Sequence, residues 1–129
     1  TQNILHPDKK QAVDYSAMPH AIFSSPQIAG VGKTEEELKE DGIPYTVARD
    51  EFKNTAMGEA MLDETGFAKF LIDPDTLKVH GCHIMGPEAS ILILVGLKSG
   101  DGTINDVLKT VHIHPALSEI VQRAAGSFE

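Results

Sequence analysis

Two apolar segments joined by a proline-containing turn constrain the fold of this chain most strongly. Residues 66–72 and 79–85 are rich in strand-forming side chains, and they flank Asp73-Pro74-Asp75-Thr76. Proline fixes φ in such a turn, and aspartate side chains accept hydrogen bonds from the backbone that follows them. The pattern predicts an antiparallel hairpin, and therefore a sheet with antiparallel strands at its centre.

Shorter signals lie on the amino-terminal side of this hairpin. Strands are predicted at 21–23, 28–31 and 45–49, whereas residues 54–65 favour neither helix nor strand. Thr34 is followed three residues later by Glu37, and Gly42 provides a stop, so a helix is predicted over about 35–41.

Prolines punctuate the carboxyl-terminal third. Pro87 stands where a first helical position is expected before the apolar segment 88–98, and Pro115 does so before a last helix. Thr103 can cap a short helix that runs through residues 106–108. Segment 88–98 is apolar nearly all round, so we expect its own sheet and a second subunit to bury it. The predicted class is α+β, an antiparallel sheet flanked by short helices.

Length and charge exclude several classes of function. The 129 residues suit one main domain, expected at 19–129 after a linker at 1–18 that arrives from a missing upstream domain. A net charge of −8 without a basic run argues against nucleic acid or an anionic membrane as partner. With one cysteine, no long apolar run and no signal-like start, the chain is expected to be cytoplasmic.

Two motifs resemble known sites without completing them. Gly30-Val31-Gly32 begins like a phosphate-binding fingerprint, but Glu35 replaces the third glycine, so a tight turn before a capped helix is expected. A zinc site built from His80, Cys82, His112 and His114 is kept as an alternative. Such spacing has little specificity, so no metal site is predicted.

The most informative pair of residues is His114 and Glu119. If Pro115 opens a helix, Glu119 lies about one turn further on, where its carboxylate can reach back to the imidazole. A carboxylate bound to one ring nitrogen orients the ring and stabilises its protonated form, as a general acid/base requires. The residues alone leave two interpretations open, a structural cap and a catalytic pair.

The segment around this pair resembles the carboxyl-terminal signature of the flavin-dependent disulfide reductases, and most of all their dihydrolipoamide dehydrogenase branch. The resemblance rests on residues 112–119 and also on 19–32, 66–73 and 81–90. These four blocks stand in the family's order and cover about residues 15 to 125.

The resemblance implies a dimerisation domain that forms a homodimer and lends residues to the partner's active site. His114, held by Glu119, would exchange a proton with a dithiol or disulfide substrate, and the backbone of His114 and Pro115 would lie against the partner's FAD. The glycine-rich fingerprints for FAD and NAD(P) and the redox cysteine pair are absent from this sequence. FAD and NAD(P) are therefore expected only in the full-length enzyme, and this fragment is expected to be inactive and without cofactor.

Two other functions stay open. One is the same domain in a reductase of mycothione or another low-molecular-weight disulfide, because residues 113–117 also resemble mycothione reductase. The other is a homodimeric interaction module without catalytic function.

Overall fold

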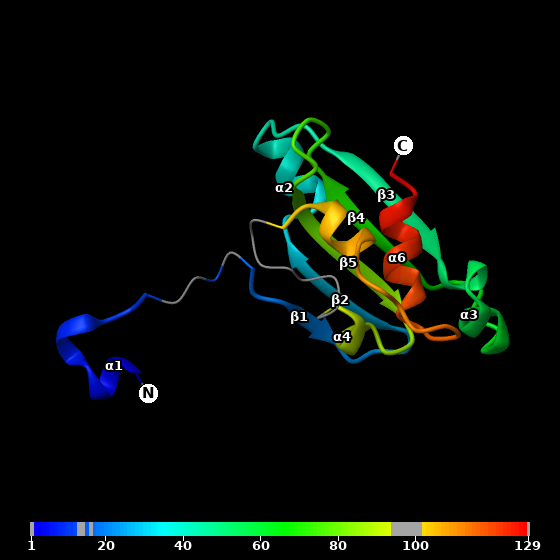
Figure 1. The fold of residues 1–129 in the computed structure, drawn as a ribbon, viewed down its shortest axis with the longest axis horizontal. Helices are drawn as coiled ribbons and strands as arrows, with labels where there is room; N and C mark the ends of the chain where they lie inside the picture. Colours follow the sequence, from blue (N-terminus) through cyan, green and yellow to red (C-terminus); the bar gives the residue numbers. More distant parts are fainter. Residues whose placement is uncertain (1, 13–14, 16, 94–101, 129) are drawn as a thin grey trace.

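The computed structural model describes residues 2–12, 15, 17–93 and 102–128, and its centre is a five-stranded antiparallel sheet (Figure 1). The strands lie in the order β1-β2-β5-β4-β3. Their bounds are β1 His20–Ile22, β2 Gln27–Gly32, β3 Thr46–Glu51, β4 Phe67–Ile72 and β5 Val79–Gly86. The α+β class predicted from the sequence is confirmed.

The central hairpin is formed by β4 and β5, as predicted. Phe70 lies opposite Cys82, and the register shifts between Leu71 and Ile72. In the turn, the Asp73 carboxylate accepts hydrogen bonds from the next backbone N–H groups, at 3.0 Å from Asp75 and 2.8 Å from Thr76. The aspartate therefore closes the turn as its sequence indicated.

Short helices surround the sheet. Their bounds are α1 Gln2–Leu5, α2 Glu35–Glu40, α3 Ala56–Ala60, α4 Ala89–Leu92, α5 Ile104–Leu108 and α6 Glu119–Gly126, with 3₁₀ turns η1 Pro7–Lys9 and η2 Phe52–Asn54. Helix α6 packs on β3 and β4, α5 packs against α6, and α4 contacts β1, β2 and β5 (Figure 1). The main core lies between these helices and the sheet, and its largest members include Phe52, Phe70, Ile72, Ile84 and Ile120.

Helix α2 begins at the predicted cap. The Thr34 hydroxyl accepts from the Glu37 N–H at 3.2 Å, and the Glu37 carboxylate accepts from the Thr34 N–H at 2.8 Å. These reciprocal bonds satisfy two N–H groups that a helix start otherwise leaves without partners. Strand β2 ends at Gly32, which has a left-handed φ of 73°, and only Lys33 separates it from the Thr34 cap.

The segment 54–65, which the sequence left undecided, contains helix α3. Thr55 is buried and caps this helix by accepting from the Gly58 N–H at 3.0 Å. The preceding Phe52 is completely buried, and a Cβ at Gly66 or at Gly86 would lie 2.6 Å from its ring. Phe52 therefore packs against two glycines that are remote from it in sequence.

Both proline-based predictions of a helix start are wrong. Helix α4 begins at Ala89, because Glu88 has a left-handed φ of 55° that no α-helix continues. Residues 94–98 of the predicted apolar helix lie outside the described residues. Helix α6 begins at Glu119 and not at Pro115. The N–H groups of Glu119 and Ile120 bond to carbonyls only three residues earlier, so tight turns precede the helix.

The amino-terminal segment, which contains α1 and η1, extends away from the sheet (Figure 1). Thr103 stands at the N-cap of α5 as predicted, and its N–H accordingly donates to the Asp106 carboxylate at 3.3 Å. In the described part of the chain, no helix has the length and apolar character that crossing a membrane requires.

Candidate functional site

His114 and Glu119 form a direct contact at the start of α6. Nδ1 of His114 lies 2.7 Å from Oε1 of Glu119. The other carboxylate oxygen, Oε2, accepts from the Ala116 N–H at 3.1 Å. Glu119 thus bonds to the residue before Pro115 and to the residue after it. The His114–Pro115 peptide bond is cis. The pair that the sequence indicated is therefore present. The residues between His114 and Glu119 form tight turns, however, and not the predicted first turn of an α-helix.

This contact indicates the ionisation of Glu119 and the position of the hydrogen on the His114 ring. The hydrogen bond from His114 is the largest of the effects that hold the pKa of Glu119 below its ordinary value, and the Ala116 N–H adds to it. Glu119 is therefore a carboxylate at neutral pH and can only accept, so Nδ1 of His114 carries the hydrogen. In the neutral ring, Nε2 is left with a lone pair. The His114 side chain is 69 % exposed, so this ring is accessible from outside the chain.

Helix α6 holds Glu119 in place through its contact with the sheet. Ile120 and Val121 are completely buried in the core directly after Glu119. One turn later, Nε of Arg123 donates to Oδ2 of Asp50 in β3 at 2.8 Å. Helix α6 is thereby fixed to the sheet by a buried apolar face in its first turn and by an ion pair one turn later.

The residues on either side of His114 are strongly exposed. Val111 is 94 % exposed and Ile113 is 77 % exposed, which is unusual for side chains of this kind. His112 differs from His114, because its Nε2 is buried and finds no hydrogen-bond partner within the described residues. Of these two histidines, His114 is the one that this segment presents outward.

The four residues of the zinc alternative do not form a metal cluster. Cys82 is completely buried in the core, and burial raises the pKa of its thiol to about 12. Within residues 2–12, 15, 17–93 and 102–128, no three His, Cys, Asp or Glu side chains are grouped so that they could hold a metal ion. The structure therefore gives the four-ligand zinc site no support.

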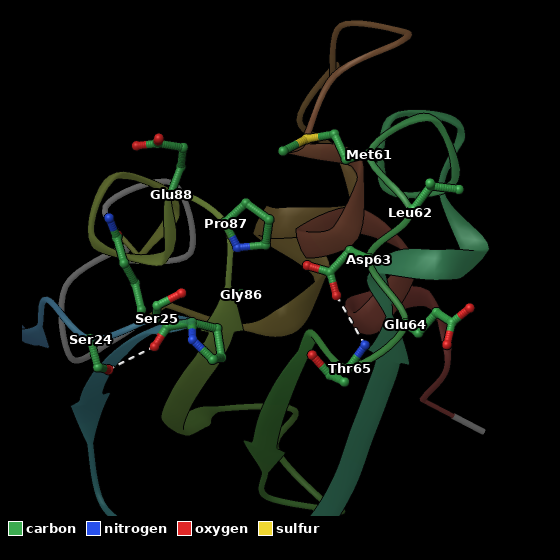
Figure 2. Close-up of a pocket in the computed structure, with 12 residues that line it drawn as sticks. Ser24, Ser25, Met61, Leu62, Asp63, Glu64, Thr65, Gly86, Pro87 and Glu88 are labelled. Atoms are coloured by element: carbon green, nitrogen blue, oxygen red, sulfur yellow. Dashed lines mark hydrogen bonds between the residues drawn. The ribbon is translucent and has the colours of Figure 1, made fainter.

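A cavity of about 600 Å³ opens at one end of the sheet (Figure 2). The β1–β2 turn, the loop after α3 and the end of β5 form its wall, and its lining includes Ser24, Ser25, Met61, Asp63, Glu64 and Glu88. The Asp63 carboxylate is held in its loop by the Thr65 N–H at 3.0 Å. None of the predicted site residues lines this cavity.

Two residues of the site were not found from the sequence, Asp50 and Arg123. Their contact joins positions 73 residues apart, and neither stands in a recognisable motif. The only available signal was that Arg123 follows Glu119 by four residues, which places both on one face of a helix.

The fold and this pair define a class of protein, an α+β domain that presents a histidine–carboxylate pair at an exposed apolar edge. Residues 18–125 match the model of the pyridine nucleotide-disulphide oxidoreductase dimerisation domain. The chain belongs to this family.

Curated relatives agree with that assignment. A mitochondrial dihydrolipoyl dehydrogenase of Dictyostelium discoideum is 41 % identical over 116 residues, which are 88 % of this chain and 24 % of that protein. A leghemoglobin reductase of Glycine max is 36 % identical over 116 residues, with 88 % and 22 % covered. The chain thus spans about a quarter of the length of these curated relatives.

The solved structures show the same fold. LpdA from Mycobacterium tuberculosis superposes with a TM-score of 0.85 at 22 % identity, over 98 % of this chain and 28 % of that one. The HOCl-induced flavoprotein disulfide reductase RclA from Escherichia coli gives a TM-score of 0.87 at 21 % identity, with 99 % and 30 % covered.

Proposed function

We propose that this chain pairs the subunits of a larger, dihydrolipoamide dehydrogenase-like flavoprotein disulfide oxidoreductase that uses NAD(P)H. In that enzyme, His114 and Glu119 supply the acid/base of the partner subunit's active site. The observation that carries the proposal is the 2.7 Å contact between Nδ1 of His114 and the Glu119 carboxylate on an exposed segment. Family membership and the similarity to dihydrolipoyl dehydrogenases support it.

The chemistry assigned to His114 is proton transfer. A dithiol substrate has a thiol pKa of roughly 8.5, so most of it is protonated at neutral pH and attacks a disulfide slowly. Nε2 of His114 accepts the thiol proton as the sulfur attacks, and the Glu119 carboxylate stabilises the imidazolium that results. In the reverse direction the same nitrogen returns the proton to the leaving thiolate, so one group serves both halves of the exchange.

The residues of this chain fit one edge of a flavin-binding site, and they do not form a complete site. His114 and Pro115 are both exposed and are joined by a cis peptide bond. Glu119 accepts a hydrogen bond from the next N–H, that of Ala116. The backbone of His114 and Pro115 would lie against the partner's FAD, which when bound accepts the electrons of the dithiol. The remaining contacts to FAD and NAD(P) belong to other parts of the longer protein, so the chain alone is expected to purify without flavin.

Homodimer formation is the second part of the proposal. The exposed side chains Val111 and Ile113 flank the segment that would enter the partner's site. A two-fold interface would bury the same apolar edge on both subunits and would place each His114 beside the other subunit. The cytoplasmic location and the linker role of residues 1–18 stay predictions.

Mixed dimers of the full-length enzyme test whether His114 acts in the active site of the partner subunit. One subunit carries His114→Gln and the other lacks its redox cysteines, so that each homodimer is inactive. If His114 acts in the partner's site, the mixed dimer has one complete site and regains activity. Without recovery, His114 acts within its own subunit or not at all. If the His114→Gln homodimer keeps full activity, the chain is a non-catalytic interaction module.

A further inference from the structure

Two histidines from different strands converge over a glycine on the sheet. Gly30 in β2 pairs with His20 in β1 on one side and with His83 in β5 on the other. A Cβ on Gly30 would lie 2.9 Å from Nδ1 of His83 and 3.1 Å from Nε2 of His20. Both ring nitrogens therefore lie within 3.1 Å of the point where a Cβ of Gly30 would stand, so the two rings meet over this glycine and leave no room for a side chain there.

The hydrogen bonding of His83 directs a lone pair toward Gly30. Its Nε2 lies 3.0 Å from the backbone carbonyl of Lys33. A carbonyl only accepts, so Nε2 carries the hydrogen and Nδ1 of the neutral ring is the free acceptor over Gly30. Histidines that bind metals commonly donate their second nitrogen to a backbone carbonyl in this way.

We propose that His20 and His83 form a two-histidine site for a late first-row divalent cation such as Zn²⁺ or Cu²⁺. Neutral imidazole nitrogens suit these ions, and water would complete the coordination. Metal–nitrogen bonds of about 2.0–2.1 Å require a small rotation of the rings, which His20 can make because it is exposed. The site uses no residue of the His114–Glu119 pair and is independent of the proposed enzyme function.

The charges around the site are already compensated. Lys69 is the neighbour of His83 in β4, and its ammonium group is bound to the Glu35 carboxylate at 2.6 Å. Lys33, whose carbonyl holds His83, pairs through its own ammonium group with Asp41. The repulsion between a divalent cation over Gly30 and these two lysines is therefore reduced by their paired carboxylates. The net charge of −8 on the chain also attracts cations.

Titration of the purified chain with Zn²⁺ alone, followed by NMR of the histidine ring protons, tests this site. We expect the His20 and His83 signals to move together on one curve and to return on chelation. His20→Gln and His83→Gln should each weaken zinc binding by about tenfold or more. His6→Gln, in the amino-terminal segment, is the matched control and should leave the affinity unchanged.

Gly30→Ala gives a second test that keeps both ligands. Its methyl group would press on both rings and force them to shift, so we expect zinc binding to weaken about tenfold while the protein stays folded. If this variant fails to fold, the exposed His20→Gln variant decides, with its backbone amide spectrum confirming the fold. Separate curves for the two rings, movement of other histidines instead, or unchanged affinity in His20→Gln would overturn the proposal.

Discussion

Arg123 of α6 donates from Nε to Oδ2 of Asp50 in β3 at 2.8 Å, and this ion pair joins the helix that carries Glu119 to the edge of the sheet. The Asp50 side chain is only 14 % exposed, whereas that of Arg123 is 50 % exposed. One partner of the ion pair is therefore largely shielded from solvent, and we expect the pair to contribute modestly to the stability of the fold.

Asp50→Asn should destabilise the chain by about 1 kcal/mol at pH 7. Burial acts to raise the pKa of Asp50, but hydrogen bonds from Asn54, the Glu51 N–H and Arg123 outweigh it, so the pKa lies below 3.8. A lowered carboxyl pKa stabilises the fold above the unfolded-state pKa and loses this effect as pH falls through the folded-state pKa. Urea unfolding should thus show a smaller difference between variant and wild type at pH 3 than at pH 7.

The exposed Asp75, changed to Asn, is the control for this experiment and should change stability little. An equal loss in both variants, or a loss in Asp50→Asn that is as large at pH 3 as at pH 7, would argue against a specific ion pair.

Cys82 should resist thiol reagents while the chain is folded. The side chain is completely buried and its pKa is raised to about 12, so at pH 8 the reactive thiolate is both rare and inaccessible. Mass spectrometry after iodoacetamide treatment should show labelling only when urea is added. Rapid labelling of the native chain would mean that β5 opens readily or that Cys82 is not in the core.

The chain should associate with itself through the exposed edge that contains Val111 and Ile113. Changing both to Asp removes two apolar side chains, each worth roughly 1.5–3 kcal/mol when fully buried, and adds two like charges. Sedimentation velocity should show a dimer for the wild type and a dissociation constant at least about tenfold higher for the variant.

Ile4→Asp provides the matched control for self-association, since Ile4 is 83 % exposed and lies before the segment that matches the family. It should leave the dimer intact. A wild-type chain that remains monomeric at high micromolar concentration, or equal effects of the two changes, would contradict the assignment of this edge.

Local signals explain which parts of the fold were predictable. The Thr34 cap and the Asp73 turn consist of hydrogen bonds between residues two or three positions apart, so the sequence contains the complete motif. Phe52 is the opposite case, because it is buried by Gly66 and Gly86, and no local pattern reports that contact. The segment around it could therefore not be assigned from the sequence.

The candidate site was predictable for the same reason, but only in part. His114 and Glu119 are near in sequence, so their spacing allowed the contact even though Pro115 opens turns and not a helix. Proline fixes φ for a turn as well as for a first helical position, and the sequence does not separate the two. The convergence of His20 and His83 over Gly30 depends on strand register, which only the sheet reveals.

The central claim is that His114 is the acid/base of the thiol exchange and His112 is not. His114 is exposed and bound to Glu119, whereas Nε2 of His112 is buried. Positioned acid–base groups contribute roughly a hundred- to ten-thousand-fold to rate. His114→Gln should therefore slow the dithiol half-reaction by a factor in that range, and Glu119→Gln should slow it less, because an acceptor remains while the charge is lost.

Stopped-flow reduction of the bound flavin by a dithiol, in the full-length enzyme, measures this step directly. The account predicts a large rate loss in His114→Gln, a smaller loss in Glu119→Gln and a rate near wild type in His112→Gln, with flavin content unchanged in all three. A severe loss in His112→Gln instead, or equal rates in the three variants, would contradict it.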